Sequence, residues 1–297
     1  MKLALVFPGQ GSQHVGMGKP LAEVFSAARE VFDEVDDALG RRLSRVMFEG
    51  PDGDLTATEN AQPALMAVSM AVLRVLIDQG GFDVGEAAAY VAGHSLGEYA
   101  ALAAAGALSL PETARLLQAR GEAMQRAASG AQGAMSALLG ADIAMAEAAT
   151  ARAGEETGEI CVVANDNAPG QVVISGQGTA LDRAEALAQE AGAKRAIRLD
   201  VSAAFHSPLM ASAAAEMRDI LAAADLRPPT PPVMANVTAA PVTDPEEIRD
   251  LLERQITGRV RWREGIEAMM AAGVDTVAEL GAGKVLTGLN RRIHRDL

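Results

Sequence analysis

The chain has 297 residues, of which 49% are hydrophobic and 22% charged, and its formal net charge is −13. This length and composition are typical of a core-forming protein with one large domain or two modest ones. The acidic balance argues against a nucleic-acid-binding protein, because phosphates require a basic surface, and it disfavours binding to anionic membranes. The single cysteine, Cys161, excludes an intramolecular disulfide.

Two apolar runs could be mistaken for targeting or membrane segments. Residues 3–7 are too short for the apolar part of a secretory signal, and Pro8 ends them. The run at 66–73 meets Arg74 too early to span a bilayer. We therefore expect a cytoplasmic enzyme without a membrane partner.

Alternating strand-like and helix-like segments make up the first part of the chain. Strands are expected at 3–7 and 88–92, and helices at about 20–39, 62–79 and 111–128. A glycine-rich loop at 8–13 follows the first strand, and GHSLG at 93–97 follows the second. This order is typical of an α/β domain with a parallel sheet.

The segment from about 129 to 202 has the order βαββαβ, which is the ferredoxin-like split motif. Its expected elements are strands at 135–139, 160–164, 172–175 and 195–199, with helices at 142–153 and 179–191. The α/β pattern then returns, with a helix from Ser207 and Pro208 to about 224, strands at 233–237 and 276–280, and helices at 245–256 and 263–272. We predict an α/β fold in which 1–128 and 203–297 form a hydrolase-like parallel-sheet domain and 129–202 form an inserted ferredoxin-like subdomain.

The five residues GHSLG at 93–97 match the G-x-S-x-G pattern of a nucleophile elbow. The two glycines remove the Cβ atoms that would block a sharp turn from strand to helix. The hydroxyl of Ser95 is then exposed at a helix N-terminus, where the macrodipole favours developing negative charge. The pattern predicts a nucleophilic serine, and the alternative is a tight turn with an unreactive one.

A serine nucleophile requires a general base. The chain has four histidines, His14, His94, His206 and His294. We predict that His206 is the base, because it follows Ser95 in the chain and directly precedes a helix start that favours neutral imidazole. No acidic residue has a clear place as its orienting partner. Asp200 is the nearest but closes a predicted strand, so a neutral carbonyl is the alternative.

Arg120 lies on the apolar stripe of the predicted helix 111–128 and has no acidic residue three or four positions away. A buried guanidinium without a partner is costly, so its counter-charge must come from elsewhere. Two possibilities remain open: a distant Asp or Glu of the protein, or a substrate carboxylate held by both ends of the guanidinium.

Five motifs occur in a distinctive order that covers essentially the whole chain. They are FPGQGSQ at 7–13, GHSLGE at 93–98, QARG at 118–121, AFHS at 204–207 and GAGKVL at 281–286. Together they resemble the malonyl-CoA:acyl carrier protein transacylases of type II fatty acid synthesis. One departure is Ala282, where proline is frequent in the family. The family's fold, a hydrolase-like domain with a ferredoxin-like insert, agrees with the order of elements.

The resemblance implies a malonyl transferase that works through a malonyl-serine ester on Ser95. His206 would accept the serine proton and later activate the thiol of the second substrate. The main-chain carbonyl of Gln255 would orient His206, and the backbone N–H groups of Gln10 and Leu96 would form the oxyanion hole.

The resemblance also implies the binding groups and the partners. Arg120 would bind the malonyl carboxylate, Phe205 would meet an α-methyl group, and Asn165 and Asn167 would lie near the cleft. The substrates would be malonyl-CoA and the phosphopantetheine thiol of an acyl carrier protein. We expect no metal, no separate cofactor and a monomer.

The carrier protein is expected to be acidic, so docking to this acidic chain requires a local basic face. The candidates are two arginine clusters, at 259, 261 and 263 and at 291, 292 and 295. Two other functions stay open. One is a serine hydrolase, although an HGGG-type oxyanion segment is missing. The other is a catalytically silent scaffold or a trans-acting subunit of a polyketide assembly, which the intact Ser95 and His206 disfavour.

Overall fold

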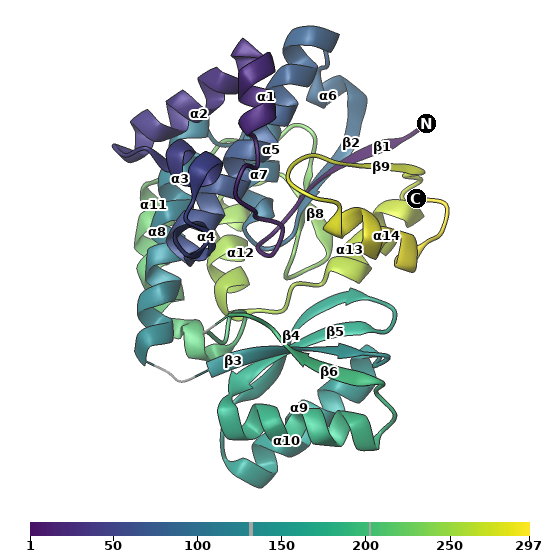
Figure 1. The fold of residues 1–297 in the computed structure, drawn as a ribbon. Helices are drawn as coiled ribbons and strands as arrows, with labels where there is room; N and C mark the ends of the chain where they lie inside the picture. Colours follow the sequence, from purple (N-terminus) through teal and green to yellow (C-terminus); the bar gives the residue numbers. More distant parts are fainter. Residues whose placement is uncertain (131–132, 202) are drawn as a thin grey trace.

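The computed structural model describes residues 1–130, 133–201 and 203–297. The strands of these ranges form a five-stranded and a four-stranded sheet (Figure 1). The larger sheet has the order β8-β7-β2-β1-β9, in which the pairs β1–β2, β1–β9 and β2–β7 are parallel and β8 is an antiparallel edge strand. Its strands are β1 (Leu3–Phe7), β2 (Ala88–Gly93), β7 (Val233–Ala235), β8 (Ala240–Val242) and β9 (Thr276–Glu279).

The smaller sheet has the order β4-β5-β3-β6, and all its pairs are antiparallel. Its strands are β3 (Gly133–Leu139), β4 (Cys161–Ala168), β5 (Gln171–Gln177) and β6 (Arg195–Arg198). The helices α9 (Ile143–Thr157) and α10 (Gly178–Glu190) cover the face that is turned away from the larger sheet (Figure 1). Since this is the βαββαβ arrangement expected from the sequence, the predicted fold class is confirmed.

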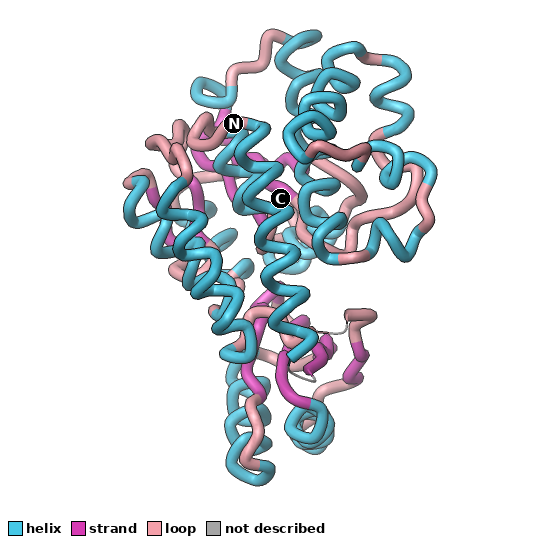
Figure 2. Tube along the Cα trace, turned by 90° about the vertical axis from the view of Figure 1, so that its left-hand side faces the viewer, coloured by secondary structure: helices cyan, strands magenta, loops and turns pink. Residues whose placement is uncertain are grey.

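The remaining helices surround the larger sheet, and the smaller sheet with its two helices projects from one end of this part (Figure 2). They are α1 (Lys19–Val24), α2 (Ser26–Leu39), α3 (Leu43–Glu49), α4 (Asp52–Thr56), α5 (Thr58–Gly80), α6 (Val84–Ala87), α7 (Gly97–Ala104), α8 (Leu110–Gly130), the short 3₁₀ helix η1 (Pro208–Met210), α11 (Ala211–Ala223), α12 (Pro245–Thr257), α13 (Trp262–Ala271) and α14 (Val285–Ile293).

Strand β1 shows why the larger sheet is covered on both faces. Successive side chains of a strand point to opposite faces, and every residue of β1 is buried. Leu3, Leu5 and Phe7 pack in the core that includes α5, α7 and α8. Ala4 and Val6 pack in a second core, with residues of α13 and α14. A continuous apolar run of this kind is typical of a central parallel strand.

Helix α5 is long and apolar enough to cross a membrane by length and composition. Within the protein, however, 67% of its most apolar window is buried. It packs against α2 and α8 on one side of the larger sheet. We therefore interpret α5 as a core helix.

Several predicted elements differ in their bounds. The helix expected at 20–39 is two helices, because Phe25 between them has an extended backbone (φ −117°, ψ 120°) and packs against the core. Strand β4 continues to Ala168, into the turn expected at 167–170. The sequence patterns also missed several elements, namely α3, α4, α6, β8 and α14.

The limits proposed for the two parts of the chain, at 128/129 and 202/203, remain a prediction. The first limit, between 128 and 129, falls inside α8. Residue 202, the last of the predicted subdomain, and residues 131–132 lie outside the described residues.

Candidate active site

Ser95 lies in a strained turn between β2 and α7, with a φ of +53°. The turn requires glycine on both sides. A Cβ on Gly93 would lie 1.9 Å from the backbone of Gly97, and a Cβ on Gly97 would lie 2.3 Å from the backbone oxygen of Phe7. Because only glycine fits at such distances, the G-x-S-x-G spacing is a steric requirement of this turn.

The structure brings Ser95 and His206 together, although they are 111 positions apart in the sequence. Ser95 Oγ lies 2.8 Å from His206 Nε2. On the other side of the ring, Nδ1 lies 2.8 Å from the main-chain oxygen of Gln255 and 3.2 Å from that of Gly258. Carbonyl oxygens only accept, so Nδ1 carries the proton and Nε2 accepts from the serine hydroxyl.

The environment keeps this imidazole neutral. His206 is only 4% exposed. Burial, together with the nearby charge of Arg120, lowers the pKa of His206 to about 3. Asp200 lines the same cavity, but within the described ranges the ring nitrogens contact main-chain carbonyls and the serine, and no carboxylate. The group that the geometry offers as a base is therefore an uncharged histidine.

Arg120 reaches the serine from α8 and is 1% exposed. Its Nη2 donates to Ser95 Oγ at 3.2 Å and to Gln255 Oε1 at 2.9 Å. Its Nη1 donates to Gln62 Oε1 at 2.7 Å. Among the residues that the structure describes, no Asp or Glu forms an ion pair with Arg120. The guanidinium therefore lies beside the serine without a carboxylate of the described residues in contact with it, and Glu98 acts on it only from a longer distance.

Three polar side chains, those of Asn236, Gln255 and Glu98, form hydrogen bonds on the side of the elbow away from the cavity. The sequence did not single out Asn236 or Glu98 as site residues, and it gave Gln255 a different role. Asn236 Oδ1 accepts from the Ser95 N–H at 2.8 Å, and its Nδ2 donates to the Gly93 oxygen at 2.7 Å. Gln255 Nε2 donates to the Ser95 oxygen at 3.0 Å and to Glu98 Oε2 at 2.7 Å. A glutamate inside the otherwise apolar start of α7 was the one local signal for this cluster.

A cavity of about 430 Å³ opens in front of Ser95. Its walls come from both parts of the molecule. Gln10, Arg120, Phe205 and His206 line it from the larger part, and Asn165 of β4 lines it from the smaller part. The site is thus a cleft between the two parts, as is common for small-molecule sites.

The remaining predicted residues lie around this cleft. A Cβ on Gly9 would lie 2.6 Å from the His94 oxygen, so the loop that carries Gln10 packs directly on the elbow. Within the described ranges, the backbone N–H groups of Gln10 and Leu96 have no hydrogen-bond partner. Asn167 Oδ1 lies 2.8 Å from His94 Nε2, so this asparagine of β4 contacts the elbow rather than the cavity.

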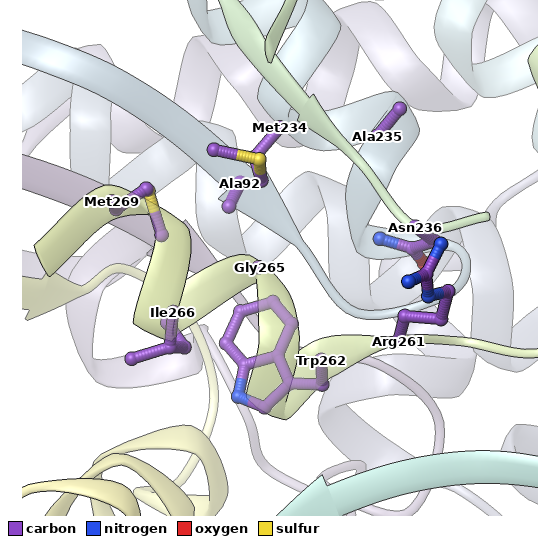
Figure 3. A pocket seen from close by; sticks show the side chains of 9 residues that line it. All are labelled: Ala92, Met234, Ala235, Asn236, Arg261, Trp262, Gly265, Ile266 and Met269. Atoms are coloured by element: carbon purple, nitrogen blue, oxygen red, sulfur yellow. The ribbon is translucent and has the colours of Figure 1, made fainter. Parts of the chain in front are cut away.

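A second, much smaller cavity lies behind the elbow and is shown in Figure 3. Its volume is about 10 Å³, which is room for about one water molecule. Met234, Met269 and Trp262 form much of its wall, and Asn236 lies at its edge (Figure 3). The Trp262 ring also packs 5.7 Å from His94. This cavity is part of the packing that supports the elbow.

An elbow serine beside a neutral histidine, at the edge of a covered α/β sheet, is the arrangement typical of acyl-transferring and hydrolytic enzymes of the serine type. The sequence matches the acyl transferase domain family over residues 4–295, and the chain belongs to this family. It is 45% identical over 296 residues to a malonyl CoA-acyl carrier protein transacylase of Bacillus subtilis strain 168, covering 100% of this chain and 92% of that protein.

Solved structures agree with this assignment. An acyl-carrier-protein-S-malonyltransferase from Bartonella henselae is 55% identical, with a TM-score of 0.96 over 100% of this chain and 94% of that one. A malonyl-transacylase in complex with its type II polyketide synthase acyl-carrier protein is 40% identical, with a TM-score of 0.95 over 100% and 94%. The predicted resemblance to malonyl-CoA:acyl carrier protein transacylases, and the enzyme class that it implies, are confirmed.

Proposed function

We propose that this enzyme transfers a malonyl group from malonyl-CoA to the phosphopantetheine thiol of an acyl carrier protein, for fatty acid biosynthesis, through an ester on Ser95. The observation that carries the proposal is Arg120. A buried arginine that touches the nucleophile and has only neutral acceptors around it, among the described residues, requires an anion from outside. The free carboxylate of a malonyl thioester is such an anion, and a guanidinium can hold it with two hydrogen bonds.

In the first half of the reaction, Ser95 Oγ attacks the thioester carbonyl and its proton passes to His206 Nε2, which lies 2.8 Å away. The negative charge that forms on the carbonyl oxygen is stabilised by the N–H groups of Gln10 and Leu96. The tetrahedral intermediate expels the thiolate of coenzyme A, which takes the proton from His206. The products of this half are free coenzyme A and the malonyl-serine ester.

The second half reverses these steps with another thiol. The carrier's phosphopantetheine thiol gives its proton to His206 and attacks the ester, and Ser95 leaves with the proton returned. The main-chain oxygen of Gln255 holds the ring in place throughout. Phe205 lines the cavity where a substituent on the malonyl carbon would extend, so it limits larger acyl groups.

The described contacts favour one of the two basic clusters as the face for the carrier protein. Arg259, Arg261 and Arg263 are each paired with a carboxylate of the chain itself. Arg291, Arg292 and Arg295 are exposed on or just after α14 and form no ion pair within the described ranges. We assign docking to this second cluster, and we expect the enzyme to act as a monomer in the cytoplasm.

The decisive experiment is intact-mass measurement after incubation with equal amounts of malonyl-CoA and acetyl-CoA. We expect a malonyl adduct that exceeds any acetyl adduct, that disappears on adding carrier protein, and that is absent in Ser95→Ala. An adduct that is released to water as fast as to the carrier would indicate a hydrolase. Absence of any adduct would indicate a catalytically silent protein.

A further inference from the structure

The two side chains that hold the guanidinium of Arg120 are both amides. Gln62 comes from α5 and Gln255 from α12, and they are 1% and 0% exposed. Each accepts a hydrogen bond through its amide oxygen, Gln62 from Nη1 at 2.7 Å and Gln255 from Nη2 at 2.9 Å. Buried arginines usually have a carboxylate partner, because a neutral acceptor does not compensate the charge. Two neutral acceptors, and no carboxylate among the described residues, are therefore an unusual set of partners for a buried arginine.

The orientation of both amides is set by what lies behind them. Gln255 Nε2 donates to the Glu98 carboxylate, so its oxygen is turned toward the arginine. Gln62 Nε2 lies 3.7 Å from the sulfur of Met124, so its oxygen also faces the guanidinium. The nearest buried acid, Glu98, is thereby kept one amide away from Arg120. The Nε of Arg120 has no partner among the described residues, so donor capacity is left over.

We propose that Gln62 is a positioning residue for acyl-group selectivity: it holds Arg120 beside Ser95 with a neutral oxygen, so that the positive charge stays available for the substrate carboxylate. This inference rests on the proposed malonyl-binding role of Arg120. A glutamate at position 62 has nearly the same shape. Its carboxylate would pair with the guanidinium and repel the free carboxylate of the malonyl group.

The test is Gln62→Glu, assayed for transfer of malonyl and acetyl groups from their CoA thioesters. We expect kcat/KM for malonyl to fall on the order of a hundredfold relative to acetyl, as a charge a few ångströms away would produce. Acetyl transfer is the internal reference, because acetyl carries no carboxylate. An unchanged ratio of malonyl to acetyl in folded protein would overturn the proposal.

The chain offers a matched control on the same helix. Asn60 accepts a hydrogen bond from Arg41 Nη1 at 2.6 Å, which is another amide-to-arginine contact, but neither residue lines the cavity. Asn60→Asp therefore adds the same charge to α5 beside another arginine. We expect its malonyl-to-acetyl ratio to equal that of the unmodified enzyme, and an equal shift in both variants would contradict a specific role for Gln62.

A second variant covers the case in which Gln62→Glu does not fold. Gln62→Met removes the acceptor without adding a charge, so Arg120 Nη1 loses its hydrogen bond. We expect KM for malonyl-CoA to rise several-fold more than KM for acetyl-CoA, and an equal change in the two KM values, or no change in either, would overturn the proposal. Arg120→Ala distinguishes failure of the malonyl-binding role of Arg120 from failure of the role of Gln62. If it leaves the ratio unchanged, the malonyl-binding role itself fails; if it shifts the ratio and the Gln62 variants do not, only the present inference fails.

Discussion

His206 Nδ1 lies 2.8 Å from the main-chain oxygen of Gln255, where many serine enzymes place a carboxylate. A neutral carbonyl fixes the ring and its tautomer, but it gives little stabilisation to an imidazolium. Buried next to Arg120, the ring therefore has a pKa of about 3. The arrangement favours a base that stays neutral across the physiological range and is charged only briefly during the reaction.

The first prediction concerns pH. A histidine of ordinary pKa would make formation of the malonyl-enzyme fall on the acid side near pH 6.5. Because the pKa of His206 is lowered to about 3, we expect kcat/KM for this half-reaction to show no such inflection between pH 5 and 8. Rapid-quench measurement of coenzyme A release across that range checks it, and an inflection near 6.5 that is specific to this step would contradict it.

The second prediction concerns Arg120. Replacing it by alanine removes the contact to Ser95 and the positive charge that we propose binds the substrate carboxylate. We expect malonyl transfer to drop by about a hundredfold or more while acetyl transfer is relatively favoured. Arg120→Lys keeps the charge but loses the two-pronged geometry, so it should recover only part of the loss. Competition between the two CoA thioesters measures this, and a preference that stays the same in Arg120→Ala would rule out the assigned role.

The third prediction concerns the elbow. Gly93→Ala places a Cβ 1.9 Å from the backbone of Gly97, which cannot move aside because it starts α7. We expect loss of several kcal/mol of unfolding free energy or failure to fold. Gly80→Ala is the control, since no atom lies within 4 Å of its new Cβ at the end of α5. Thermal unfolding should find that control unchanged or slightly stabilised, by up to about 1 kcal/mol.

The fourth prediction concerns Glu98, which is 2% exposed behind the elbow. Burial raises its pKa from 4.5 to about 7, against its hydrogen bonds from Gln255 and Asn236. The protonated form is thus favoured in the folded state. This contribution, on the order of 3 kcal/mol, is fully present below pH 4.5 and is lost as the pH rises through 7.

Glu98→Gln removes that dependence. We expect the unfolding free energy of the variant, relative to the unmodified enzyme, to increase between about pH 4.5 and pH 7 and to level off above pH 7. The lowered pKa of His206 acts in the opposite sense, since its contribution is present above pH 6.5 and lost as the pH falls toward 3. Both proteins share it, so it cancels in the difference. Urea unfolding at several pH values provides the measurement, and a constant difference would show that Glu98 keeps an ordinary pKa.

The sequence by itself determined the features that depend on neighbouring residues. The G-x-S-x-G spacing around Ser95 follows from the steric needs of a strand-to-helix turn, and the apolar run of β1 follows from burial on both faces. The βαββαβ order likewise predicted the antiparallel smaller sheet. Near the elbow, however, only the glutamate at position 98 indicated the buried polar cluster that Asn236 and Gln255 form with it.

Only the tertiary structure decided what surrounds Ser95. From the sequence, the partner of Arg120 could be either an acidic residue of the protein or a substrate carboxylate. In the structure, Gln62 of α5 and Gln255 of α12 bind the two ends of the guanidinium, and no carboxylate of the described residues forms an ion pair with it. Asn236 reached the elbow from the end of β7 in the same way. Such contacts join elements more than fifty residues apart, and they are set by how helices pack across a sheet. No local periodicity or spacing encodes them, because each side chain is specified by the cavity that it fills rather than by its neighbours in the chain.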